Sequence, residues 1–325
     1  MARVLNEEVM VAGKRAFKLG VILPEAEGDM AGETAGWSDY LAMARLAEEI
    51  GLDSVWFVDH LLYRGDATAV EQQGARECWS ILAALAAVTN RVEIGPLVTC
   101  TSYRNPALLA KMADTVDEIS GGRLILGIGA GWHEAEYQAF GFPFDHRVAR
   151  FEEAFTIVRT LLREGRIDFE GTYYSARECE LRPRGPRPNG PPLMIGSKGA
   201  RMLRMTLPHV DSWNVWLSGS RSNADQIPPL RETVDAACHD VGRDPATVER
   251  TISIMIDMTG KREIGPSMQP DSADPLTGSP AEIGAGLTAI ANEGISHIHA
   301  YLVPNTIQSI DAFAGVLDEL ERAAS

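Results

Sequence analysis

The feature that most constrains this chain is a regular alternation of short apolar runs with longer segments of helical spacing. The β-prone runs lie at 17–23, 54–58, 92–99, 123–129, 193–196, 212–216, 251–257 and 295–303. Helices are predicted between them at 37–50, 78–88, 106–119, 147–163 and about 224–241, from 200, from 280, and up to about 323. Strands that alternate with helices form a parallel sheet. Eight such units predict a (β/α)₈ TIM barrel with insertion segments, and an open doubly wound sheet is the competing architecture.

Three segments depart from this alternation. Residues 1–16 precede the first strand as an N-terminal extension, and 165–191 combine β-prone runs around Gly-Thr with a Pro/Arg/Gly-rich stretch. We interpret 165–191 as a β-hairpin and connector inserted into the barrel. Residues 260–279 are rich in proline and glycine and are predicted to form a mobile loop. No composition change marks a linker, so the whole of 1–325 is predicted to be one domain.

Charge and cysteine content exclude several classes of function. The formal net charge is −15, which argues against nucleic acid or an acidic membrane as a partner. The four cysteines contain no CxxC pair, and no His/Asp/Glu group has metal-ligand spacing, so neither a disulfide framework nor a metal site is expected. The first residues lack the apolar core of a secretory signal, and no apolar run approaches the ~18–20 residues that span a bilayer. We therefore expect a cytoplasmic protein.

Polar and aromatic residues gather where the predicted strands end, which is where a TIM barrel builds its active site. His60 directly follows the second strand, a position suited to a general acid or base near neutral pH. A hydrogen-bonded structural histidine is the alternative, and His133 has the same two interpretations. On the last strand, one of His297 and His299 is expected to face the barrel interior or mouth, with a structural role.

Two glycine-containing turns suggest close approach of a ligand. In GIGAGW (127–132), Gly127, Gly129 and Gly131 end the fourth strand, but Trp132 replaces the last glycine of the dinucleotide fingerprint G-x-G-x-x-G. The alternative is that these glycines only let the next helix pack closely. In GSKGAR (196–201), small residues and two cations lead into a helix, as in phosphate-binding turns. An ordinary tight turn is the alternative there.

The chain resembles the luciferase-like monooxygenase superfamily, and within it the branch of coenzyme F420-dependent oxidoreductases. The resemblance extends from Phe17 to the last helix. It is carried by FVDHLL (57–62), PLVTCTSYRNPALLAKMADTVDEISGGRLILGIGAGWHEAEYQAFGFPF (96–144), RFEEAFTIVRTLL (150–162), GTYY (171–174), PPLMIGSKGARMLRM (191–205) and VDSWN (210–214). These motifs are specific for the superfamily and much less specific for the cofactor.

The resemblance implies hydride transfer between the deazaflavin F420 and a small organic substrate, with His60 as the catalytic proton donor or acceptor. It further implies a homodimer, and a cis peptide beneath the cofactor ring at about Gly95–Leu97, although Pro96 leaves the exact bond open. The glycines of the fourth strand would then let the ring approach. The implied cofactor-binding residues are Pro96, Leu97, Thr99, Gly129, Gly131, Trp132, His133, Gly196, Ser197, Lys198, Gly199, Ala200, Arg201 and Trp213.

Two alternative functions remain open, and two positions of the sequence differ from the motifs of one member of the family. An FMN-dependent monooxygenase and a non-catalytic flavin- or F420-binding protein are the competing functions. Lys198, Arg201, Arg204 and Arg104 are expected to offset the anionic tail of F420, which favours F420 over FMN. A sugar-phosphate dehydrogenase of the family has tryptophan at position 64 and glutamate at position 132. The arginine and tryptophan found there argue against glucose-6-phosphate as substrate.

Overall fold

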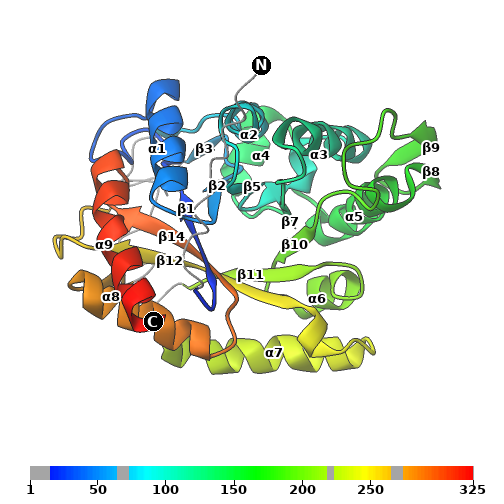
Figure 1. The fold of residues 1–325 in the computed structure, drawn as a ribbon. Coiled ribbons are helices and arrows are strands. Elements are labelled where there is room, and N and C mark those ends of the chain that lie inside the picture. Colours follow the sequence, from blue (N-terminus) through cyan, green and yellow to red (C-terminus); the bar gives the residue numbers. More distant parts are fainter. Residues whose placement is uncertain (1–14, 64–72, 218–222, 265–273, 325) are drawn as a thin grey trace, which may run out of the picture.

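A computed structural model describes residues 15–63, 73–217, 223–264 and 274–324. Within these ranges, parallel strands form a barrel surrounded by helices, so the fold prediction is confirmed (Figure 1). The order around the barrel is β5-β2-β1-β14-β12-β11-β10-β7-β6. The bounds are β1 Lys18–Ile22, β2 Ser54–Phe57, β5 Glu93–Pro96, β6 Thr99–Cys100, β7 Leu126–Gly129, β10 Leu193–Gly196, β11 Ser212–Trp216, β12 Glu249–Asp257 and β14 His297–Val303.

The barrel closes between the third and fourth predicted strands. Ile94 of β5 forms a parallel bridge with Leu124, and β6 pairs with β7 farther along. The run 92–99 was predicted as one strand, but it is divided into β5 and β6 at a cis peptide bond between Leu97 and Val98. That bond begins at Leu97, the last residue of the predicted segment Gly95–Leu97. It does not involve Pro96, so it is not a prolyl bond.

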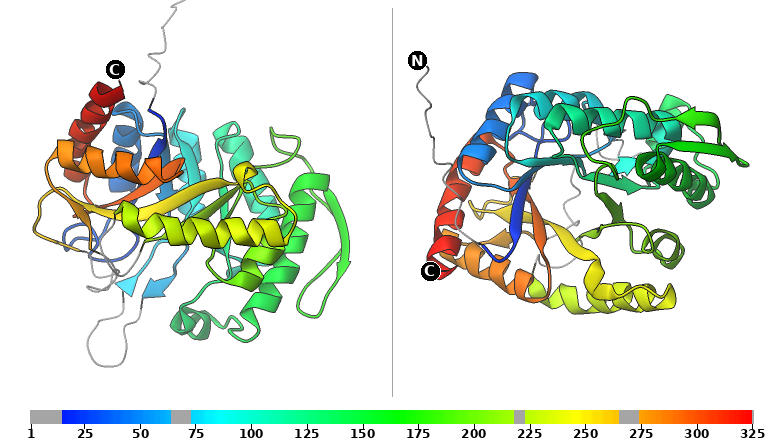
Figure 2. Two further views of the ribbon diagram at one scale, coloured as in Figure 1. Left: turned by 90° about the horizontal axis from the view of Figure 1, so that it is seen from below. Right: turned by 45° about the vertical axis from the view of Figure 1, so that its right-hand side comes forward.

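Helices cover the outside of the barrel on all sides (Figures 1 and 2). Their bounds are α1 Trp37–Glu49, α2 Cys78–Val88, α3 Pro106–Ser120, α4 Glu134–Phe140, α5 Arg147–Glu164, α6 Ala200–Thr206, α7 Ile227–Asp240, α8 Pro280–Asn292 and α9 Ile307–Ala324. Their ends follow local chemistry. Asn105 caps α3 by accepting from the backbone N–H of Ala107, with Pro106 in its first turn, and Gly121 ends the helix at φ +67°. None of the described helices is long and apolar enough to cross a membrane.

The strands carry two different faces. On β12, Ile252, Ile254 and Ile256 belong to the large apolar core between strands and helices, whereas Thr251 and Ser253 alternate with them and face inward. This period-two pattern holds because successive side chains of a strand point to opposite sides. The barrel interior is therefore partly polar, while the layer under the helices is apolar.

The predicted insertion 165–191 contains the hairpin β8 (Arg166–Glu170) and β9 (Ser175–Glu180), which projects beyond α5 at the right of Figure 1. Two short pairings were not predicted: β3 (Leu62–Tyr63) with β4 (Gln73–Gly74), and β13 (Leu276–Thr277) with β12. Most of the extension 1–16 and residues 265–273 of the predicted mobile loop lie outside the described residues, as does Arg64. The described ranges also contain no cluster of side chains suited to a metal ion.

Candidate active site at the barrel mouth

Four rings from the loops after two strands, which β5 and β6 separate in the barrel, meet at the mouth, the end of the barrel where the strands terminate. His60 and Tyr63 follow β2, and Trp132 and His133 follow β7. The His60 ring centroid lies 4.5 Å from that of Tyr63 and 5.6 Å from that of Trp132, and the Trp132 and His133 centroids are 5.1 Å apart. Trp132 is 61% exposed, an unusual state for so large an apolar ring. The structure therefore brings together three residues that the sequence proposed, His60, Trp132 and His133, and adds Tyr63.

A buried carboxylate fixes the orientation of His60. Glu136, on α4, is fully buried, and its Oε2 lies 2.9 Å from Nδ1 of His60. The same oxygen accepts from the hydroxyl of Tyr103 (2.8 Å), and Oε1 accepts from the backbone N–H groups of Leu61 (2.6 Å) and Leu62 (3.0 Å). Four donors thus converge on one carboxylate. Sequence reasoning missed Glu136, because an acidic residue in the first turn of a helix is ordinarily solvated.

The pKa values of this pair follow from burial and mutual charge. Burial alone would lower the pKa of His60, but the hydrogen bond and charge of Glu136 outweigh it and raise that pKa above 6.5. For Glu136, burial opposes ionisation, yet the bonds from His60 and from two backbone N–H groups bring the pKa of its carboxyl below the ordinary value. Glu136 is therefore ionised at neutral pH, and His60 can take up a proton in the physiological range.

Two further buried acidic groups tie the mouth loops together. The hydroxyl of Tyr63 donates to Glu25, which is 2% exposed, and burial together with Glu25 raises the pKa of Tyr63 far above 10. Asp59 forms a bidentate pair with Arg104, with N–O distances of 2.6 and 2.9 Å. Arg104 is thereby committed to Asp59 and to Glu77, so the prediction that it offsets an anionic cofactor tail is wrong.

The glycines of the fourth strand make room for protein atoms. A Cβ at Gly129 would lie 2.9 Å from Cγ2 of Val98, and one at Gly127 would lie 2.3 Å from the carbonyl oxygen of Pro96. Gly131 has φ +69°, and a Cβ there would lie 2.1 Å from the hydroxyl of Tyr137 on α4. Gly131 therefore makes room for helix α4, which is the alternative interpretation, whereas Gly127 and Gly129 make room for Pro96 and Val98, which neither interpretation included.

The turn 196–201 presents its small residues and Lys198 to solvent. Gly199, Ala200, Lys198 and Arg201 are exposed, and the Oγ of Ser197 accepts from the N–H of Gly199 (3.1 Å). Arg201 pairs with Glu152 (2.8 Å), whereas Lys198 has no ion pair with any residue that the structure describes. Lys198 is therefore the cation that this turn offers to an anionic group.

Two predicted cofactor contacts point away from the mouth. Trp213 is 2% exposed and lies on the outer face of β11, against Ile227 of α7, where its indole N–H donates to the carbonyl of Ser197 (2.6 Å). The hydroxyl of Thr99, fully buried, accepts from the indole N–H of Trp79 on α2 (3.1 Å). The strand period turns both side chains towards the helices, so neither faces the mouth.

The other predicted positions divide by exposure. Pro96 and Gly129 are buried, whereas Leu97, Gly131 and Gly196 are partly exposed at the strand ends. An apolar floor that the sequence did not identify lies beside them. It consists of the partly exposed side chains Val58, Leu97, Val98, Trp216 and Ile264, packed on the buried cluster Ile22, Trp56, Met194, Met255, Tyr301 and Val303. Trp216, three residues after Trp213, is thus the tryptophan of β11 that belongs to the mouth.

Both histidines of β14 face the barrel interior, because residues two apart on a strand share a face. Only one was expected there. Nε2 of His297 lies 2.7 Å from the hydroxyl of Ser54, and Nδ1 of His299 lies 3.3 Å from the side-chain nitrogen of Asn214. Burial lowers the pKa of His297 to about 3 and that of His299 well below 6.5. Both are neutral structural groups, as the sequence predicted.

Several known proteins are similar to this chain in sequence. The chain is 30% identical over 199 residues to 5,10-methylenetetrahydromethanopterin reductase of Archaeoglobus fulgidus, which covers 61% of this chain. It is 35% identical over 164 residues, 48% of its length, to F420-dependent glucose-6-phosphate dehydrogenase of Amycolatopsis mediterranei. The matches span 54% and 47% of those relatives, about half of their length.

Solved structures share the fold over nearly the full chain. An F420-dependent secondary alcohol dehydrogenase, in complex with an F420–acetone adduct, superposes with a TM-score of 0.75 at 18% identity, covering 94% of this chain and 99% of the other. The sequence profile described as luciferase-like monooxygenase matches residues 17–263. The chain belongs to the luciferase-like monooxygenase family.

Proposed function

We propose that this protein is an oxidoreductase that transfers a hydride between coenzyme F420 and a small organic substrate at the barrel mouth. The observation that carries the proposal is the pair formed by His60 and the buried Glu136, set beside Tyr63 and the exposed ring of Trp132 at the carboxyl ends of the strands. The names of the two relatives, a reductase and an F420-dependent dehydrogenase, support the same reaction class.

The residues at the mouth fit a planar ring that carries a phosphate-bearing chain. Val58, Val98 and Trp216 leave apolar surface partly exposed, which a ring of aromatic character would cover. The turn at Ser197–Gly199 offers exposed backbone beside Lys198, which suits a phosphate. When bound there, the deazaflavin would supply the hydride, and the side chains of the mouth would position the substrate and exclude water.

Glu136 determines which nitrogen of His60 handles the proton. An ionised carboxylate accepts hydrogen bonds but cannot donate, so Nδ1 of His60 must carry the hydrogen in that contact. Nε2 is then the atom that holds or releases a proton during turnover. The negative charge of Glu136 stabilises the protonated ring, so His60 can act as an acid towards a carbonyl or imine and as a base in the reverse direction.

The first test is a paired titration of the purified protein with F420 and FMN, followed by fluorescence. Tight F420 binding with weak FMN binding is the expected result, and Lys198→Ala should weaken it. Tight FMN binding, with oxygen consumption by reduced FMN, would instead place the protein among the monooxygenases. If neither cofactor binds, the proposed site is wrong.

Binding without turnover is a separate outcome. A protein that binds F420 but converts no member of a panel of enones, imines, ketones and alcohols would be a cofactor-binding protein without catalytic function. The geometry at His60 argues against that outcome. Glu136 accepts one bond from His60 and three from other donors, so the protein fixes both the position and the charge of the carboxylate beside this imidazole.

A further inference from the structure

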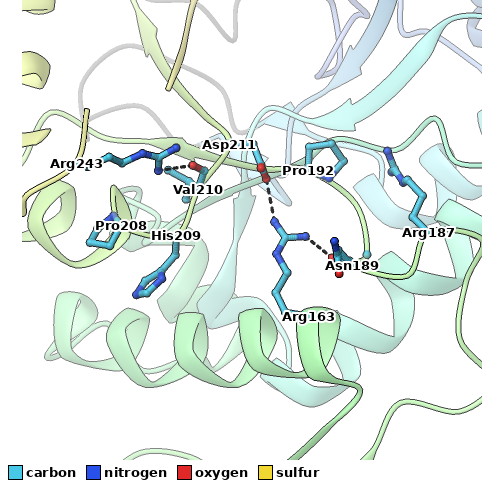
Figure 3. Close-up of a pocket in the computed structure, with 10 residues that line it drawn as sticks. Arg163, Arg187, Asn189, Pro192, Pro208, His209, Val210, Asp211 and Arg243 are labelled. Atoms are coloured by element: carbon cyan, nitrogen blue, oxygen red, sulfur yellow. Dashed lines mark hydrogen bonds and ion pairs between the residues drawn. The ribbon is translucent and has the colours of Figure 1, made fainter. Parts of the chain in front are cut away.

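A cavity lies at the opposite end of the barrel from the mouth. Its volume is about 450 Å³, and it opens where β10 and β11 begin, beside the end of α5. Figure 3 shows Arg163 rising from α5 between Asp211 and Asn189, with Arg243 on the left and Arg187 on the right. At about 3.3 Å per residue, the four residues of β10 separate this cavity from the mouth by about 13 Å. It is a separate site from the one described above.

The arginines keep donors available after their structural bonds are made. Nη1 of Arg163 donates to the carbonyls of Asn189 and Pro191 (3.1 Å to Pro191), and Nη2 donates to Asp211 (2.9 Å), while its Nε meets no acceptor among the described residues. Arg187 uses Nε and Nη2 on Asp117 and on a backbone carbonyl, and no acceptor in the described ranges meets its Nη1. Both side chains remain about a quarter exposed, at 26% and 28%.

Positive charge in the cavity exceeds negative charge. Arg163 and Arg187 have carboxylate partners in Asp211 and Asp117. Arg243 donates to the carbonyls of Leu207, Val210 and Thr247 and to the hydroxyl of Thr247, and it forms no ion pair within the described residues. Carbonyl oxygens satisfy its N–H groups without neutralising its charge. In a chain with a net charge of −15, such a local excess is the reverse of the average surface.

His209 lies on the edge of the same cavity and adds a donor. Its Nδ1 lies 3.4 Å from Nη1 of Arg159, and because arginine can only donate, Nδ1 is the acceptor and Nε2 carries the hydrogen. Burial first, and then the charges of Arg159 and Arg243, lower the pKa of His209. Part of this decrease is due to the two arginines, whose charges add to the positive potential at this place.

We propose that this cavity binds the phosphate group of a small phosphomonoester. Guanidinium groups recognise phosphate through charge-assisted hydrogen bonds. In this wall Arg163 and Arg187 keep N–H groups for such bonds, Arg243 adds positive charge, and His209 adds a neutral donor. The volume lies within the range of small-molecule sites and exceeds what the phosphate group alone would fill. The carboxylate of Asp211 is balanced by its ion pair with Arg163, and the same Oδ2 accepts from the backbone N–H of Leu193 (2.7 Å), so Arg243 carries the excess positive charge.

The experiment measures binding of inorganic phosphate and of glycerol 3-phosphate to the whole protein at constant ionic strength, by calorimetry and by the NMR resonances of the His209 ring. The expected result is a saturable shift of the His209 resonances, with glycerol 3-phosphate binding at least tenfold more tightly than phosphate. Equal affinities for the two compounds would contradict the proposed phosphomonoester and identify free phosphate as the ligand. An unshifted His209 would overturn the site altogether.

Two matched variants localise the binding. Asn189→Asp adds a carboxylate beside Arg163 with almost no change of shape and should weaken binding at least tenfold. Asn292→Asp makes the same change at an exposed position on α8 and should leave binding unchanged. Equal effects of the two would mean that only overall charge matters, which contradicts the proposal. Binding that is lost in Lys198→Ala, with His209 unshifted, would assign the phosphate to the turn at the mouth instead.

Discussion

Histidines in two regions of this barrel are driven to opposite protonation states. At the mouth, His60 contacts an ionised carboxylate, and its pKa is raised above 6.5. In the interior, His297 contacts the hydroxyl of Ser54 and the rings of Trp56 and His299, and burial, with a smaller effect of the Lys18 charge, lowers its pKa to about 3. Burial acts in the same direction on both. The partner decides the outcome, since a buried imidazole accepts charge only where a counter-charge is already in place.

The difference separates a group that can exchange protons from one that holds the barrel together. His60 is partly exposed at the end of β2, so a substrate can reach it. His297 is 3% exposed and, through Ser54, links β14 to β2. A substitution at His60 should therefore lower turnover, whereas one at His297 should lower the free energy of unfolding.

The largest effect is expected for His60→Gln. General acid–base groups contribute about 10²–10⁴-fold to rate, so turnover should fall by that range while the cofactor dissociation constant changes little. The measurement is kcat with saturating cofactor, alongside a cofactor titration. His297→Gln is the matched control and should lower the free energy of unfolding rather than kcat. Unchanged turnover in His60→Gln would remove His60 from the mechanism.

Glu136→Gln keeps the shape of the side chain and removes its charge. The imidazole remains, so turnover should fall by less than in His60→Gln. The pKa that governs the pH–rate profile should move down, because the carboxylate no longer stabilises the protonated ring. A purely structural Glu136 would leave the profile in place while lowering stability. Glu136→Asp, which restores charge, should return part of the shift.

Acid should destabilise the protein through the interior histidines. Because the pKa of His297 is about 3 when folded and about 6.5 when unfolded, the unfolded state binds the proton first. Stability is then lost as the pH falls from 6.5 towards 3, by about 2 kcal/mol at pH 5 for this group alone. Chemical denaturation at pH 7.5 and pH 5 measures the loss. An equally large loss in His297→Gln would show that other groups cause it.

His60 should produce the smallest effect, and with the opposite sign. Its pKa is raised on folding, so the stability that it contributes is complete below pH 6.5 and is lost as the pH rises through the folded-state pKa. The same denaturation series extended to pH 9 measures this decrease. The decrease should be absent in His60→Gln. An increase in stability over that interval in the unmodified protein would contradict the raised pKa.

The sequence predicted the architecture well because the apolar runs are sharply bounded, and strands that alternate with helices leave few topologies. It failed where the outcome depends on which face of a strand is turned inward. In VDSWNVW, Asn214 lies among apolar residues, and that polar position marks the inner face. Reading the strand by its period of two would have placed Trp216 at the mouth and Trp213 under the helices.

The site could be predicted only in part, for a different reason. His60 and the pair Trp132–His133 were found because they follow strand ends. Glu136 was not found, since its burial depends on two backbone N–H groups that lie more than 70 residues away in the chain. The filling of the glycine positions by Val98 likewise depends on the course of the backbone between β5 and β6, which no local pattern encodes.

The four bonds on Glu136 have a consequence for anyone who wishes to change the specificity of this protein. The loop after β2 and helix α4 are far apart in the sequence, yet the carboxylate of Glu136 on α4 accepts three hydrogen bonds from that loop. A loop transplanted from a relative without the matching helix would leave that carboxylate buried and short of donors. In recombination experiments the two segments should behave as a single inherited unit, and chimeras that divide them should be recovered mainly as insoluble protein.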